Sequence, residues 1–130
     1  MDLLCKDLTD KIIWVFYKVY NELGFGFLEK VYENAMMIEL RKNGLSCSRQ
    51  QRVEVFYFGE QVGEYFADII VNNSVILELK AAEFLAPEHE AQLINYLKGT
   101  NIEVGLLLNF GKKPEFKRKV FANERKKNPI

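Results

Sequence analysis

The sequence predicts a single α/β domain in which helices flank a mixed central sheet. Its 130 residues are about the usual length of one domain, and no repeat, low-complexity run or linker divides them. The spacing of apolar residues changes from a helical period to a period of two after residue 44, and a strand, helix and strand then follow. The predicted order is ααβββαβ, with a basic C-terminal tail over residues 112–130.

The first two elements are predicted to be amphipathic helices over residues 7–22 and 27–43. Apolar side chains recur at three- and four-residue spacing in both segments. Gly24, Phe25 and Gly26 separate them, and Asn43-Gly44 ends the second helix. Most aromatic residues lie at core spacing, so the sequence predicts no stacking platform for nucleobases; this set includes Phe16, Tyr17, Tyr20, Phe25, Phe27, Tyr57 and Phe58.

Three strands are predicted next, over residues 53–58, 64–71 and 75–80. The first turn is expected at Gly59–Gly63 and the second at Asn72–Ser74, because Gly and Asn favour tight turns. These three strands supply one part of the expected mixed sheet.

The last helix and strand predict a parallel pairing. Pro87 suits the first turn of a helix that extends to about Lys98. Residues 104–108 are almost all apolar, which is typical of a strand buried on both faces. A strand, a crossover helix and another buried strand favour a parallel pair with a right-handed connection.

The charge is distributed unevenly along the chain. The chain has 18 Lys and Arg residues and 18 Asp and Glu residues, a net charge of zero, which gives no support to a generally basic nucleic-acid binder. Residues 112–127, however, hold eight basic and two acidic side chains, a net charge of +6, and leave −6 on the remainder. The zero total therefore does not exclude nucleic acid as a partner.

Other global features limit the function classes. Two cysteines are too few for a disulfide framework or a four-cysteine zinc site. The N-terminus shows no secretory signal, and no apolar stretch approaches the length of a membrane span. We therefore expect a cytoplasmic protein with no membrane partner.

The hairpin around Asn73 places two carboxylates opposite each other. If the turn is centred on Asn73, Asp68 and Glu78 are cross-strand neighbours with Cβ atoms about 5 Å apart. Such a pair requires that one carboxyl be protonated or that a cation lie between them. The other hairpin face is predicted to be core, with Ala67, Ile69, Val71, Val75, Leu77 and Leu79.

A divalent ion is the more economical explanation of this pair. Mg²⁺ prefers oxygen ligands and commonly uses one or two carboxylates with water and phosphate. Lys80 projects from the same face as Glu78, so metal ligands and a positive group share a small volume, which suits phosphodiester hydrolysis. The alternative from the pattern alone is a solvated cross-strand salt bridge.

Several ordered motifs indicate a family. Gly26, Glu29 and Tyr32 form a G-x-x-E-x-x-Y motif. Further blocks follow at Phe66–Asp68, Glu78–Lys80, His89–Leu97 and Gly105–Gly111. On these residues the chain resembles the GxxExxY protein family, which is similar in fold to the PD-(D/E)XK nuclease superfamily. The resemblance covers about residues 7–121 and implies a restriction-endonuclease-like domain.

The resemblance also implies roles for individual residues. Asp68, Glu78 and the carbonyl of Leu79 would hold Mg²⁺ or Mn²⁺, and Lys80 would be the catalytic lysine. Glu29 corresponds to the acidic residue on an early helix near the metal, although a plain helix-start acid remains an alternative. Ala67 stands where the superfamily motif has a proline.

Two residues of the last helix match a further motif. Gln92 and Tyr96 fit the Q-x-x-x-Y pattern beside the site in RecB-like nucleases. Gln92 completes the expected catalytic set with Glu29, Asp68, Glu78 and Lys80. Tyr32, in contrast, is expected to be a core residue with a hydrogen-bonded hydroxyl.

The sequence thus predicts a metal-dependent nuclease that hydrolyses phosphodiester bonds in DNA. The alternative is a non-catalytic module that keeps the nuclease fold and binds nucleic acid or protein. A second copy of the chain is a further candidate partner, since two copies of so small a domain would span a duplex. The expected nucleic-acid contacts are Tyr96, Lys112, Lys113, Lys117, Arg118 and Lys119.

Overall fold

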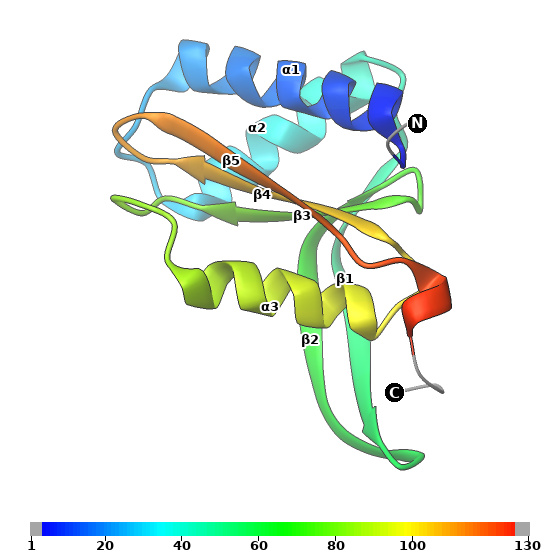
Figure 1. Cartoon of the computed structure of the whole chain (residues 1–130). Helices are drawn as coiled ribbons and strands as arrows, with labels where there is room; N and C mark the ends of the chain where they lie inside the picture. The colour runs from blue at the N-terminus through cyan, green and yellow to red at the C-terminus, as the bar shows by residue number, and fades with distance from the viewer. Residues whose placement is uncertain (1–3, 127–130) are drawn as a thin grey trace.

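The computed structural model describes residues 4–126, and Lys127 of the basic segment lies outside this range. A five-stranded mixed sheet has helices on both faces (Figure 1). The strands lie in the order β1-β2-β3-β4-β5, and only β3 and β4 are parallel. Their bounds are β1 Cys47–Tyr57, β2 Glu60–Val71, β3 Val75–Lys80, β4 Val104–Phe110 and β5 Pro114–Val120. The predicted α/β fold class is confirmed.

Three helices cover the sheet. Helices α1 (Lys6–Leu23) and α2 (Glu29–Lys42) lie on one face and α3 (Pro87–Lys98) on the other, and a short 3₁₀ helix η1 (Asn123–Arg125) follows β5 (Figure 1). Each face has its own apolar core, and β3 and β4 contribute to both. Within the described residues, no helix combines the length and apolarity needed to cross a membrane.

The basic segment is more than a tail, because residues Pro114–Val120 form the fifth strand. This strand pairs antiparallel with β4, with Leu108 opposite Phe116 and Val104 opposite Val120. All seven residues of β4 are buried, so an uncovered outer edge would leave its backbone groups without partners. Phe116 and Val120 pack against the α1–α2 core, and the three consecutive basic residues between them, Lys117–Lys119, conceal this strand in the sequence.

The β1–β2 hairpin extends beyond the body of the domain as a long arm (Figure 1). Its turn consists of Phe58 and Gly59, with φ of 48° and 83°, and not of Gly59–Gly63 as predicted. Gly63 lies within β2 opposite Val55. The Phe58 ring is 89% exposed, so the expectation that Tyr57 and Phe58 belong to the core is wrong.

The α1–α2 connection is fixed by Tyr32. Its hydroxyl donates a hydrogen bond to the carbonyl of Gly24 at 2.6 Å and accepts one from the backbone N–H of Phe27 at 3.3 Å. Its buried ring stacks on Phe110, with ring centroids 4.2 Å apart. Tyr32 is therefore a core residue with a hydrogen-bonded hydroxyl, as predicted.

Removal of this hydroxyl tests its part in the fold. We expect Tyr32→Phe to lower the free energy of unfolding by about 1–3 kcal/mol, because the carbonyl of Gly24 and the N–H of Phe27, both in part-buried hydrogen bonds, lose their partner. Urea denaturation measures the change. Tyr57→Phe, at an exposed position of the hairpin arm, should stay within about 0.5 kcal/mol of the wild type. Equal effects of the two substitutions would contradict the assigned role of Tyr32.

Candidate metal and catalytic site

The two hairpin carboxyls meet where β2 diverges from β3. The structure has Ile69 opposite Leu77 and Val71 opposite Val75, which is the register predicted from a turn at Asn73. Regular pairing stops before Asp68. Beyond that point the backbone N–H of Asp68 donates to Glu78 Oε1 at 3.3 Å, and that of Leu79 donates to Asp68 Oδ2 at 2.8 Å. The carboxyls thus replace backbone partners at this fork.

The same divergence changes the face that Ala67 occupies. Ala67 packs with Ile70 and Ile76 in the core under α3, whereas Ile69 packs in the core under α1 and α2. The prediction that Ala67 and Ile69 share a face is therefore wrong. In β1, Gln50 has a φ of 54° and lies between Arg49 and Gln51, which pair with Ile69 and Ala67, and it interrupts the regular pairing with β2. A local bend in both strands explains the exchange of faces.

Burial raises the pKa of the Glu78 carboxyl. Its side chain lies in the interior, with the residue only 4% exposed. Burial and then the negative charge of Asp68 raise the pKa of Glu78 to about 9. Burial also raises the pKa of Asp68, which is partly exposed. Without a metal ion, the raised pKa of Glu78 therefore favours its protonated form at neutral pH, which relieves the repulsion between the two carboxyls.

A second acidic residue of α2, Glu33, lies near the carboxyl pair. Glu33 is 4% exposed, accepts a hydrogen bond from Gln50 Nε2 at 2.7 Å, and pairs with Lys30 Nζ at 2.6 Å. Its charge contributes to the raised pKa of Asp68. Glu29 was predicted from the sequence as a site residue, and Glu33 was not. The available signal was its position four residues later, on the same helix face.

A small cavity brings these groups together. It has a volume of about 140 Å³ and lies between α2 and the fork of β2 and β3. Glu29 lines it from the exposed first turn of α2, and Asp68 and Leu79 line it from the sheet. Glu33 also lines this cavity. The structure therefore brings predicted residues Glu29, Asp68 and Leu79 to one cavity.

Helix α3 contributes Tyr96 to the opposite face of the site. The Tyr96 ring is buried, and its centroid lies 5.0 Å from that of Tyr65. Burial, followed by the charges of Glu78 and Asp68, raises the pKa of the Tyr96 hydroxyl. Gln92 is partly exposed and lies one helical turn earlier. The predicted Gln and Tyr thus lie on α3, with Tyr96 within electrostatic range of the carboxyl pair.

Lys80 is the last residue of β3, beside Asn109 of β4. Asn109 is buried, and its side chain accepts a hydrogen bond from the N–H of Ala82 and donates one to the Ala82 carbonyl, both at 2.9 Å. Asn109 therefore fixes the segment that follows Lys80. This role of Asn109 was not predicted, although a polar residue in an otherwise apolar strand was a usable signal in the sequence.

The predicted basic contacts are divided between two faces of β5. Lys117 and Lys119 lie opposite Leu107 and Gly105, on the α3 side, and Lys119 pairs with Glu90 at 2.5 Å. Arg118 lies on the other face and donates a hydrogen bond to the carbonyl of Leu4. Lys112 and Lys113 lie in the exposed β4–β5 turn. These five residues do not form one continuous surface.

The donor set fits a hard divalent ion. Asp68 and Glu78 supply only oxygen atoms, and their proximity leaves a proton or a cation as the means of relieving repulsion. Within residues 4–126, no three His, Cys, Asp or Glu side chains are grouped closely enough to hold one ion. Mg²⁺ commonly uses only one or two carboxylates and completes its shell with water and phosphate, so the pair is sufficient.

The pKa of Glu78 predicts a pH-dependent stability of the metal-free protein. The folded state keeps a proton that the unfolded state releases above about pH 4.5, so the contribution of Glu78 to the free energy of unfolding is greatest at low pH and declines toward pH 9. We expect Glu78→Gln to reduce this decline, whose contribution from one proton is at most about 1.4 kcal/mol per pH unit. Urea denaturation in EDTA at several pH values measures it.

The matched control for this experiment is Glu60→Gln, at an exposed position of the hairpin arm. This variant should follow the pH dependence of the wild type. If Glu78→Gln also keeps the wild-type slope between pH 5 and 9, then Glu78 does not hold the assigned proton.

Comparison with known proteins places the domain in a wider group. The crystal structure of SSO0001 matches with a TM-score of 0.58 and 18% sequence identity, over 72% of this chain and 50% of that chain. The chain therefore spans half the length of that protein, and the likeness concerns the fold alone. No curated protein matches the chain. The family model described as the PD-(D/E)XK nuclease superfamily matches residues 6–119. Since this match covers almost the whole fold, the chain belongs to the PD-(D/E)XK nuclease superfamily.

Proposed function

We propose that this domain is a metal-dependent nuclease that hydrolyses phosphodiester bonds in DNA. The observation that carries the proposal is the buried contact between Asp68 and Glu78, with Lys80 two residues farther along β3. Maintaining two adjacent carboxyls in the interior is unfavourable for the fold alone. A site that alternately holds a proton and a divalent ion gives this arrangement a function.

Asp68, Glu78 and the carbonyl of Leu79 would hold Mg²⁺ or Mn²⁺. When bound, the ion would stabilise negative charge on the phosphate and lower the pKa of a water molecule. Glu78 must release its proton before its carboxylate can serve as a ligand. The N–H of Leu79 holds Asp68 Oδ2, which fixes the orientation of this carboxylate before any ligand arrives.

Other residues of the site have supporting roles in this proposal. The Lys80 ammonium would orient the attacking water or a phosphate oxygen. Glu29, at the entrance to the small cavity, would hold a water molecule or a second ion, and buried Glu33 would orient the neighbouring polar groups. Gln92 would position the metal shell or the nucleic acid.

Tyr96 and the basic residues act outside the central chemistry. Because the Tyr96 ring is buried, we assign it a positioning role beside Glu78 in place of a direct DNA contact. Lys112, Lys113 and Lys117 are exposed and supply candidate phosphate contacts. Arg118 is engaged with the N-terminal part of the chain and is not included among them.

Cleavage assays test the proposal directly. The pure protein is incubated with single-stranded, duplex and branched DNA in the presence of Mg²⁺ or Mn²⁺. We expect cleavage of at least one substrate and a loss of about 100-fold or more in Asp68→Asn and Lys80→Ala, because each removes a charge at the reacting phosphate.

Asp10→Asn is the matched control, since Asp10 is exposed on α1 and pairs with Lys6 at the protein surface. Its cleavage rate should stay close to that of the wild type. Absence of cleavage of all three substrates with both metals, or an undiminished rate in Asp68→Asn, would refute the catalytic proposal.

One observation favours a second candidate, a non-catalytic module that keeps the nuclease fold. A neutral Glu78 hydrogen-bonded to Asp68 satisfies the buried pair without any metal ion. Such a module would bind nucleic acid or protein through its surface alone. Metal binding therefore separates the two candidates.

Calorimetric titration with Mn²⁺ at pH 7.5 makes this distinction. For the nuclease we expect binding accompanied by proton release from Glu78, so that the observed heat depends on the ionisation enthalpy of the buffer. Glu78→Gln should abolish the buffer dependence, and Glu60→Gln should retain it. No binding of Mn²⁺ by the wild type would instead support the non-catalytic module.

A further inference from the structure

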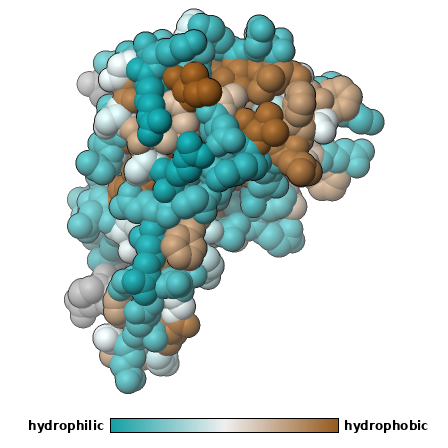
Figure 2. All heavy atoms as spheres, turned by 180° about the vertical axis from the view of Figure 1, so that it is seen from behind, coloured by the Kyte–Doolittle hydropathy of each residue, from teal (hydrophilic) through white to brown (hydrophobic). Residues whose placement is uncertain are grey.

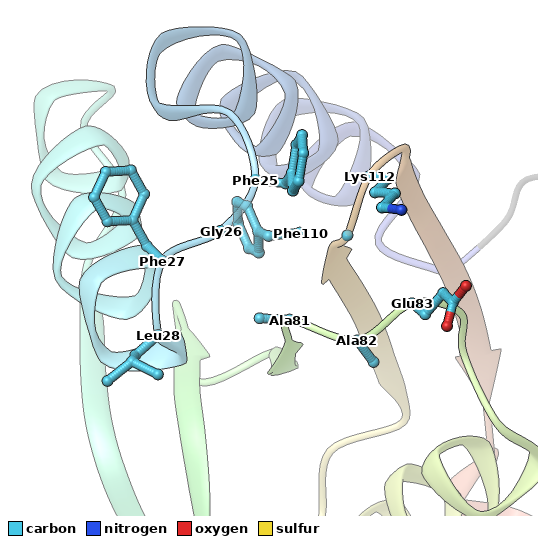
Figure 3. A pocket seen from close by; sticks show the side chains of 10 residues that line it. Phe25, Gly26, Phe27, Leu28, Ala81, Ala82, Glu83, Phe110 and Lys112 are labelled. Atoms are coloured by element: carbon cyan, nitrogen blue, oxygen red, sulfur yellow. The ribbon is translucent and has the colours of Figure 1, made fainter.

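A second, larger cavity lies beside the carboxyl site. It has a volume of about 440 Å³ and is bounded by the α1–α2 connection, the segment after β3 and the β4–β5 turn (Figure 3). Phe25 and Leu28 lie on the side of the α1–α2 connection, and Glu83 and Lys112 lie on the opposite side. A largely apolar cavity with a few polar groups is typical of a site for a small ligand group.

The structure holds Phe25 in an exposed position. Phe25 is 56% exposed and lies between Gly24 and Gly26, which have φ of 70° and 110°. The hydroxyl of Tyr32 bonds to Gly24 on one side and to Phe27 on the other. Because the connection is anchored on both sides of Phe25, the ring cannot simply fold into the core. The expectation from the sequence that Phe25 and Phe27 belong to the core is therefore wrong.

Hydrophobic side chains collect on this part of the surface. Figure 2 shows them together at the upper right, on the side of the molecule where the α1–α2 connection lies. The exposed apolar residues of this connection and the following helix are Phe25, Phe27, Leu28 and Val31. In Figure 3 the ring of Phe27 points away from the cavity, so Phe25 is the aromatic residue available to a ligand there.

The opposite wall is also held in place. The hydroxyl of Tyr20 lies 2.7 Å from the carbonyl oxygens of both Gly111 and Lys112, and so anchors the start of the β4–β5 turn. A Cβ atom at Gly111 would lie 2.3 Å from the carbonyl oxygen of Ala82, so only glycine permits this close approach. Both walls of the cavity are therefore fixed before a ligand binds.

Two segments of the chain run from the larger cavity to the residues of the proposed catalytic site. Leu28 lines the larger cavity and Glu29, the next residue, lines the smaller one. Likewise Ala81 lines the larger cavity and directly follows Lys80. A chain-like ligand can therefore place one of its groups in the larger cavity while another part of the same molecule reaches the carboxyl pair.

We propose that this cavity binds one unpaired nucleobase of a DNA strand whose phosphate backbone passes the carboxyl site. The inference rests on the proposed function for the identity of the strand. A flat base stacks on the exposed ring of Phe25. The positive charge of Lys112 is complementary to the negative charge of the adjacent phosphate. The carboxylate of Glu83 accepts hydrogen bonds from base amino groups.

This assignment defines a substrate class. A base within a duplex is stacked on both faces and paired at its edge, so it must leave the helix before it can enter the cavity. The domain therefore prefers DNA with unpaired nucleotides, in single strands or at branches, over continuous duplex. The preference depends on Phe25 and not on the catalytic carboxyls.

Fluorescence of 2-aminopurine tests the assignment separately from cleavage. The fluorescent base is placed at successive positions of a single-stranded oligonucleotide and of the matching duplex, and binding is followed with Asp68→Asn protein in Ca²⁺. We expect quenching at one position of the single strand, weak or no quenching in the duplex, and about tenfold weaker single-strand binding when Phe25→Ala is added.

Phe58→Ala is the matched control, because Phe58 is an exposed phenylalanine at the far end of the hairpin arm. It should leave the quenching unchanged. Failure of the single strand to bind, equal quenching in the duplex, or quenching that persists in Phe25→Ala would overturn the proposal. Quenching in a protein that cleaves no DNA would support the base site while refuting the nuclease. Cleavage of DNA without Phe25-dependent quenching would support the nuclease and refute the base site.

Discussion

The contact between the Glu78 carboxyl and the Asp68 carboxylate is the constraint on which the site depends. Regular pairing of β2 with β3 ends at this point, and the two side chains take over hydrogen bonds that a regular sheet would make through its backbone. The same divergence directs the hairpin arm away from the body and opens the small cavity beneath α2. The end of regular β2–β3 pairing therefore determines both the local fold and the candidate site. The close approach of the two carboxyls there is favourable only if they share a proton or a cation.

The G-x-x-E-x-x-Y motif gains a structural explanation from the anchored α1–α2 connection. Gly26 supplies a positive φ, Glu29 reaches the small cavity, and Tyr32 holds the connection through its hydroxyl while its ring stacks on Phe110. One short motif therefore shapes the wall of the larger cavity and the entrance of the smaller one. This arrangement links the proposed base site to the proposed metal site through the backbone of the motif.

Much of the fold was accessible from the sequence, because helical spacing and a turn at Asn73 determine which residues face each other. The predicted opposition of Asp68 and Glu78 follows from that turn, and the structure extends its register to Ile69. The strand β5 was missed because three consecutive basic residues, Lys117–Lys119, separate its apolar residues Phe116 and Val120 and hide the period of two. Glu33 was missed because a sequence does not distinguish a buried acid from a solvated one, and Phe25 because its exposure is set by the anchored connection around it.

The central claim is that Asp68 and Glu78 together hold a divalent ion. The most direct measurement is the anomalous scattering of a crystal of this protein soaked in Mn²⁺. The account predicts one strong anomalous peak within about 2.5 Å of an oxygen of each carboxyl, with the proton of Glu78 displaced. A crystal soaked with saturating Mn²⁺ in which the two carboxyls remain in contact with each other, with no manganese between them, would contradict it.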